Sequence, residues 1–160
     1  MKTLVVCYTL SGHTRKVAEE AAAALDADIE FLRDLGARPG FFGYLKLAHD
    51  TIRDVEPELA PLEYDPAEYD LVILAGPVWS SRMCSPVRAY AGRHKDALRR
   101  TAILCTSRSS EPGYPERSMV GMIDSAGLAP VAILGFGHRE LKQDCSDAIA
   151  RFVSTVSAAK

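Results

Sequence analysis

Residues 9–14, which read TLSGHT, place three hydroxyl side chains and a glycine between an apolar run that ends at Tyr8 and a helical pattern. The first amides of a helix have no acceptor within the helix, and the positive end of the helix dipole lies there, so such a junction attracts anions. The hydroxyls of Thr9, Ser11 and Thr14 can add hydrogen bonds of about 1.5–3 kcal/mol each to a charged acceptor. The stretch therefore predicts a phosphate-binding loop that needs no lysine.

Three other phosphate-binding motifs are absent from the sequence. It contains no GxxxxGK[ST], and it contains no GxGxxG because Gly12 stands alone. The loop of low-molecular-weight phosphatases needs a shorter spacing than the seven residues that separate Cys7 from Arg15. One alternative stays open on the residues alone: a structural turn between strand and helix in which Ser or Thr caps the helix.

The four cysteines, Cys7, Cys84, Cys105 and Cys145, form no metal-binding pattern. No two of them have the CxxC spacing of zinc sites, so we expect no metal. Cys7 and Cys105 lie in apolar runs, where buried and inert thiols are usual. Cys84 lies in a loop near the predicted site, and we interpret it as an inert thiol rather than a redox centre.

Length and charge exclude several classes of protein. The chain has 160 residues, of which 48% are hydrophobic, and a net charge of −2 with neutral histidines. This length suits a single domain over residues 1–160, and no basic cluster is dense enough for a nucleic-acid partner. The apolar run near the N-terminus is shorter than a signal peptide needs, and no run approaches the ~18 apolar residues of a membrane span. We therefore expect a cytoplasmic protein with no membrane partner.

Apolar runs alternate with helical patterns along most of the chain. Near-continuous apolar runs are typical of strands covered on both faces, whereas DIEFLR (28–33) alternates and fits an edge strand. Ser85 is a good cap for the second helix. The alternation predicts an α/β fold with a doubly wound parallel sheet. The predicted strands are 3–8, 28–33, 69–76, 101–107 and 130–137, and the predicted helices are 12–25, 86–98, 116–126 and 139–156.

Residues 34–68 depart from this alternation. They contain a short helical pattern near 43–53 and three aromatic residues, Phe41, Phe42 and Tyr44. We expect this segment to cover a binding site or to pack on an edge of the sheet.

Two stretches resemble the flavodoxin family. Its phosphate loop follows [ST]-x-[ST]-G-x-T directly after the first strand, and TLSGHT (9–14) fits every fixed position. Residues 69–90, YDLVILAGPVWSSRMCSPVRAY, resemble the third strand and flavin-contacting loop, in which a strand ends in G-x-P-x-W and a proline begins the next helix. The resemblance covers almost the whole chain. It implies a five-stranded parallel sheet in the order 2-1-3-4-5 and FMN as the cofactor.

The resemblance also implies which residues contact FMN. The phosphate would be held by the first loop, and the isoalloxazine ring would lie between the loops after the third and fourth strands, where an aromatic side chain can stack on it. The implied phosphate residues are Thr9, Leu10, Ser11, Gly12, His13 and Thr14. The implied ring residues are Pro77, Val78, Trp79, Ser80, Ser81 and Arg82 on one side, and Thr106, Ser107, Arg108, Ser109 and Tyr114 on the other. Trp79 could instead belong to the core, and Tyr114 could simply brace a turn.

Two functions follow from the resemblance: electron transfer with a redox partner protein, or a small FMN-dependent oxidoreductase that links NAD(P)H or another small-molecule donor to a quinone-type acceptor. Single-electron carriers of the family are usually strongly acidic, and a glycine commonly follows the loop tryptophan. This chain carries only −2, and Ser80 and Ser81 follow Trp79. Serine resists the positive φ that glycine accepts, so we expect these serines to oppose a turn of that peptide. The sequence names neither donor nor acceptor, and it leaves a homodimer open.

Overall fold

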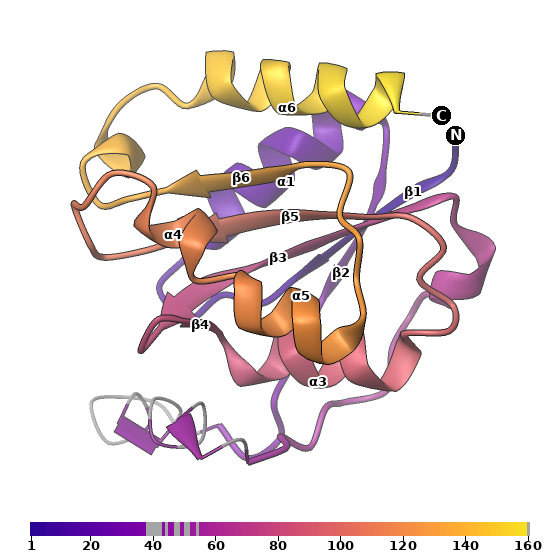
Figure 1. Ribbon diagram of the computed structural model, residues 1–160. Helices are drawn as coiled ribbons and strands as arrows, with labels where there is room; N and C mark the ends of the chain where they lie inside the picture. The colour runs from indigo at the N-terminus through magenta and orange to yellow at the C-terminus, as the bar shows by residue number, and fades with distance from the viewer. Residues whose placement is uncertain (38–42, 44, 47–48, 50–51, 54, 160) are drawn as a thin grey trace.

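The computed structural model describes residues 1–37, 43, 45–46, 49, 52–53 and 55–159. Strands and helices alternate through most of this chain (Figure 1). The strands are β1 (Thr3–Cys7), β2 (Asp28–Phe31), β3 (Leu71–Trp79), β4 (Arg82–Met83), β5 (Thr101–Thr106) and β6 (Ile133–Phe136). The helices are α1 (His13–Leu25), α3 (Ser85–His94), α4 (Tyr114–Arg117), α5 (Val120–Ala126) and α6 (Ser146–Ala158), with 3-10 turns η1 (Pro66–Glu68) and η2 (Glu140–Lys142).

Five strands form a parallel sheet in the order β2-β1-β3-β5-β6. This confirms the predicted fold class and the order 2-1-3-4-5 of the five main strands. Every residue of β1 and β5 is buried, as expected of strands covered on both faces. The alternating strand β2 lies at an edge, as its pattern predicted.

The short strand β4 was not predicted, and β3 is longer than expected. β3 continues past Gly76 to Trp79 because Val78 and Trp79 pair antiparallel with Met83 and Arg82 of β4. Two residues carry no usable periodicity, so a strand of this length comes from its pairing rather than from its own pattern.

Helices cover both faces of the sheet. Figure 1 shows α1 and α6 on one side and α3 and α5 on the other. Val17, Ala21 and Phe152 belong to the apolar cluster between the sheet and the first pair. Val87 and Met122 belong to the cluster on the opposite face.

Two predicted helices are interrupted, and one cap was wrong. The expected helix 116–126 is two short helices, α4 and α5, and the expected helix 139–156 is η2 followed by α6. The second interruption has a local cause: the Asp144 carboxylate accepts hydrogen bonds from the amide (2.9 Å) and hydroxyl (2.6 Å) of Ser146 at the start of α6. Ser85 is the first residue of α3 rather than its cap, and Cys84 holds the cap position without a side-chain hydrogen bond.

Part of segment 34–68 packs on the β2 edge of the sheet. Asp34 and Leu59 form an isolated antiparallel bridge. The buried Glu30 carboxylate accepts hydrogen bonds from the amides of Glu63 (2.7 Å) and Tyr64 (3.1 Å). The expectation that this segment packs on an edge is therefore met for residues 59–64. The aromatic residues Phe41, Phe42 and Tyr44 lie outside the described residues.

The described residues contain no cluster of His, Cys, Asp and Glu that could hold a metal ion. Within the same residues, no helix is both long and apolar enough to cross a membrane. All four cysteines are free and buried. Burial raises the pKa of the Cys84 thiol to about 12, so this thiol stays protonated at neutral pH.

Gly76 tests the packing that positions the end of β3. A Cβ there would lie 2.7 Å from Met83 Sδ and 2.9 Å from Val87 Cγ2. We expect Gly76→Ala to lower the free energy of unfolding by about 1–3 kcal/mol, as overpacked cores do. Gly92, exposed in α3 with no atom within 4 Å of its Cβ position, is the matched control. Gly92→Ala should instead raise that free energy by about 0.5–1 kcal/mol in the same urea titration.

Candidate cofactor-binding site

The loop after β1 presents the start of α1 to the end of the sheet. Gly12 precedes α1 in the left-handed conformation (φ 86°), which glycine adopts without a steric penalty. Its amide donates to Thr9 Oγ1 (3.1 Å), and its carbonyl accepts from the Lys16 amide (3.1 Å). The amides that begin a helix have no acceptor within it, and Gly12 has no side chain to cap them. The capped turn that the sequence left open is therefore not the arrangement at this helix.

One buried hydrogen bond joins this loop to the middle of the sheet. Thr14 Oγ1 lies 2.8 Å from Thr106 Oγ1, and both residues are almost completely buried. The first turn of α1 thus lies against the end of β5. A hydroxyl can donate one hydrogen bond and accept two, so this contact leaves both groups further capacity.

The β3–β4 hairpin turns through Ser80 and Ser81, which have φ values of 50° and 60°. Two consecutive residues with positive φ are typical of the tight turn that matches strand twist in a two-residue hairpin. We expected these serines to oppose positive φ, and the structure corrects that expectation. Each serine costs about 1–2 kcal/mol relative to a right-handed residue, and the pairing of Trp79 with Arg82 imposes the turn nonetheless.

Two aromatic side chains, one from β3 and one from α4, line the site. Trp79 is 8% exposed and packs edge-on against Tyr8, with ring centroids 5.9 Å apart. The half-buried Tyr114 begins α4, and its hydroxyl lies 3.0 Å from the hydroxyl of Ser81. Trp79 therefore belongs both to the core and to the site, and Tyr114 connects α4 to the hairpin turn.

The loop after β5 is held by its own side chains. Ser107 Oγ accepts from the Ser109 amide (3.0 Å), and Ser109 Oγ accepts from the Glu111 amide (3.1 Å). Serine hydroxyls commonly stabilise turns in this way. The Ser107 amide donates to the Phe136 carbonyl (2.8 Å), which ties the loop to β6.

These loops surround a cavity of about 490 Å³ at the carboxyl ends of the strands, a volume within the usual range for small-molecule sites. Thr9, Gly12, Ser81 and Arg82 are the predicted site residues that do not line it. The lining residues are Leu10, Ser11, His13, Thr14, Pro77, Val78, Trp79, Ser80, Thr106, Ser107, Arg108, Ser109, Tyr114, His138 and Leu141. Thr9 and Ser81 support this wall through their hydrogen bonds to Gly12 and Tyr114.

Comparison with known proteins identifies the fold. No protein-family model and no curated protein matches the sequence. A flavoprotein from Lactobacillus acidophilus NCFM, crystallised in complex with FMN, is 22% identical with a TM-score of 0.73, and the match covers 96% of this chain and 98% of that one. The chain has a flavodoxin-like fold.

Two further structures agree with this fold. A candidate flavoprotein from Bacteroides eggerthii is 17% identical with a TM-score of 0.75, and 98% of each chain is covered. Oxidised Flavodoxin 1 from Bacillus cereus is 16% identical with a TM-score of 0.59, and both chains are covered in full. In flavodoxin-like folds, ligands bind at the carboxyl ends of the strands, where the cavity lies.

The charge of the cavity lining is one-sided. Among the described residues that line it, none is Asp or Glu, whereas His13, Arg108 and His138 can carry positive charge. This lining suits an anionic ligand. The hydroxyls of Ser11, Thr14 and Ser109 add neutral groups that can donate hydrogen bonds to phosphate oxygens.

The structure adds His138 and Leu141 to the residues that the sequence predicted. Both follow β6, the last strand of the flavodoxin-like sheet. Ligands bind beyond the carboxyl ends of parallel strands, and this rule applies to β6 as well. The position of His138 and Leu141 directly after a predicted strand could therefore have indicated them from the sequence.

The hairpin turn offers a direct test of its backbone conformation. We expect Ser80→Gly to unfold with a free energy about 1 kcal/mol higher than Ser80→Ala, because only glycine adopts positive φ without strain. Both variants lose the same hydroxyl, so their difference isolates the backbone. Equal urea midpoints for the two variants would show that Ser80 does not hold this conformation in solution.

Proposed function

We propose that this chain binds FMN in the cavity and transfers electrons through it. The observation that carries the proposal is the composition of the cavity. It is lined at the start of α1 by a helix without a side-chain cap and by hydroxyl groups, it contains the rings of Trp79 and Tyr114, and no described lining residue is acidic. A protein of the same fold was crystallised in complex with FMN, at 22% identity to this chain.

The phosphate group would lie at the start of α1. The first amides of this helix and the hydroxyls of Ser11 and Thr14 would donate to it, at about 1.5–3 kcal/mol for each charge-assisted hydrogen bond. Thr9 would act indirectly, since its hydroxyl fixes Gly12. A single loop of this kind, without a dinucleotide motif, favours FMN over FAD.

The isoalloxazine ring would lie between Trp79 and Tyr114. Aromatic faces provide stacking area for a flat ring, and the backbone of residues 77–80 supplies hydrogen-bonding groups along its edge. Flavin supplies the redox chemistry when bound, while the protein positions it and sets its electrostatic surroundings. The Tyr114–Ser81 hydrogen bond would keep this part of the site in place.

A second function is favoured by the positive cavity lining. Arg108 would stabilise negative charge on a fully reduced flavin, which favours transfer of electrons in pairs. This is the electrostatics of a small FMN-dependent oxidoreductase with a donor such as NAD(P)H and a quinone-type acceptor. For the first function, electron transfer, we propose that the flavin exchanges electrons with a redox partner protein. Turnover of NADH or NADPH with a quinone separates the two functions.

Trp79 provides an intrinsic probe for FMN binding because it is the only tryptophan in the chain. It lines the cavity, so we expect FMN to quench its fluorescence in a saturable titration. Tight binding of FAD without binding of FMN, or quenching that does not saturate, would contradict the proposed cofactor.

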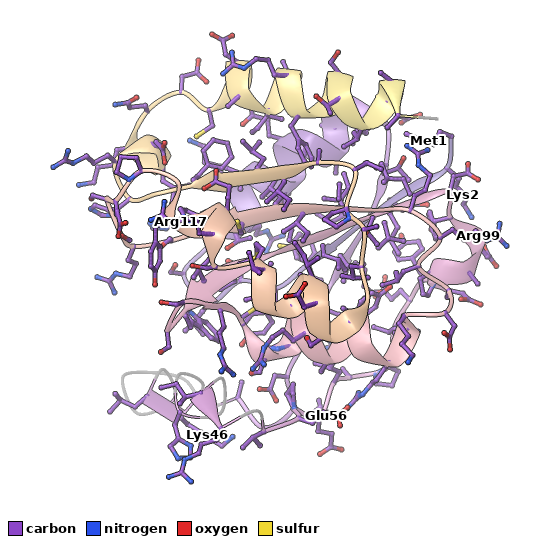
Figure 2. The ribbon with its side chains drawn as sticks, in the orientation of Figure 1. Met1, Lys2, Lys46, Glu56, Arg99 and Arg117 are labelled. Carbon is purple, nitrogen blue, oxygen red and sulfur yellow. The ribbon has the colours of Figure 1, made fainter. Side chains whose placement is uncertain are left out.

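Arg108 tests the electrostatic argument for paired electron transfer. We expect little one-electron-reduced flavin when the FMN-loaded protein is half reduced. Arg108→Gln should lower the potential of the second electron by about 30–60 mV and increase that fraction. Arg99 does not line the cavity and lies near Met1 (Figure 2), so Arg99→Gln provides a control with the same substitution. Abundant one-electron-reduced flavin in the unmodified protein would favour the single-electron carrier.

A further inference from the structure

The loop after β6 holds His138 at the cavity through close backbone contacts. The His138 amide donates to the Ser109 carbonyl (2.9 Å), and the Gly137 amide donates to Glu140 Oε2 (2.5 Å). A Cβ on Gly137 would lie 2.8 Å from the Ser109 carbonyl oxygen. Only glycine therefore allows the two loops to approach this closely, and His138 has a fixed backbone position on the cavity wall.

His138 lines the same cavity as Ser11, His13 and Thr14 at the start of α1. The Thr14–Thr106 hydrogen bond places the first turn of α1 against the end of β5. The hydrogen bond from His138 to Ser109 places the β6 loop against the residues that follow β5. The end of the same loop lies on the α1 side of the sheet, because Cys145 belongs to the same apolar cluster as Val17 and Ala21 of α1. His13 and His138 thus line one cavity, from the start of α1 and from the loop after β6.

We propose that His138 is a further phosphate-binding residue, and that it makes retention of the phosphorylated flavin depend on pH. This inference rests on the proposed binding of FMN. Histidine is the side chain whose charge ordinarily changes between pH 5 and 8, and a phosphate monoester carries about −1.5 to −2 charges at pH 7. A protonated His138 attracts that phosphate, and a neutral one does not. Riboflavin has no phosphate, so it gains nothing from the protonation.

Other charged groups surround the two histidines. Arg15 is paired with Glu19 at 2.7 Å, and Arg117 is paired with Glu111 at 2.5 Å. The Glu140 carboxylate accepts from the Gly137 amide, so it faces the backbone of its own loop. The remaining charged groups on the packed elements are Lys16 and Glu20 on α1, Arg108 after β5, Glu116 on α4, Arg139, Lys142 and Asp144 between β6 and α6, and Asp147 and Arg151 on α6. The Glu116 carboxylate accepts a hydrogen bond from the Gly135 amide of β6 (3.0 Å). Of this set, only Arg108 lines the cavity with the histidines.

The test compares His138→Gln with the unmodified protein at pH 6 and pH 8.5, with Trp79 quenching as the measure of binding. We expect the substitution to raise the dissociation constant of FMN by about five- to tenfold at pH 6 and by less than about twofold at pH 8.5, because a histidine ordinarily gives up its charge between these pH values. The dissociation constant of riboflavin should not change at either pH. At each pH, free FMN has the same protonation state in both experiments. The ratio of the two dissociation constants therefore reports the effect of the histidine alone.

Two more variants separate charge from shape. His138→Lys carries a charge at both pH values, so it should bind FMN more tightly than the unmodified protein at pH 8.5. His94→Gln is the matched control, because His94 lies on α3 and does not line the cavity. An equal effect of His138→Gln at both pH values, or an equal effect on FMN and riboflavin, overturns the inference and leaves FMN binding intact. Failure of both flavins to bind at any pH overturns the proposed function together with the inference.

Discussion

β1, β3, β5 and β6 run parallel, so their carboxyl ends meet at one edge of the sheet and the loops after them must share the same space. This alignment positions every wall of the cavity. The buried hydrogen bond between Thr14 and Thr106 connects the first and third of these loops. The hydrogen bond from Ser107 to Phe136 connects the third to β6. A change in the register of any central strand would therefore separate groups that now line one cavity.

The site differs from the rest of the chain in its backbone conformation and in its charge. Ser80 and Ser81 hold positive φ in the hairpin turn, and strained backbone of this kind is common at functional sites. Arg108 and two histidines line the cavity from the loops after three strands, with no acidic residue among the described lining, although the whole chain carries a net charge of −2. Such a field favours an anionic ligand and opposes the acidic surroundings expected of a single-electron carrier. Electrostatics of the site, rather than the fold, distinguishes the two proposed functions.

The sequence predicted the sheet and the loop over residues 9–14, because buried parallel strands have continuous apolar runs and a helix start after a strand has a recognisable composition. It did not predict β4, which exists only through pairing with β3. It also missed the break near Asp144, where a side chain caps the backbone in place of helical hydrogen bonds. His138 was missed because its position depends on the approach of Gly137 to Ser109, which no local pattern encodes. Pairing, capping and close backbone approach thus account for the differences.

The central claim is that FMN lies in this cavity with its phosphate at the start of α1. Amide chemical shifts, followed by NMR during titration with FMN and with riboflavin, test it most directly. Both ligands should shift the Trp79 indole resonance, and FMN alone should cause large shifts of the His13 and Thr14 amides, which lie where the phosphate would bind. Equal shifts of these amides with both ligands would contradict the claim, as would FMN-dependent shifts confined to another face of the protein.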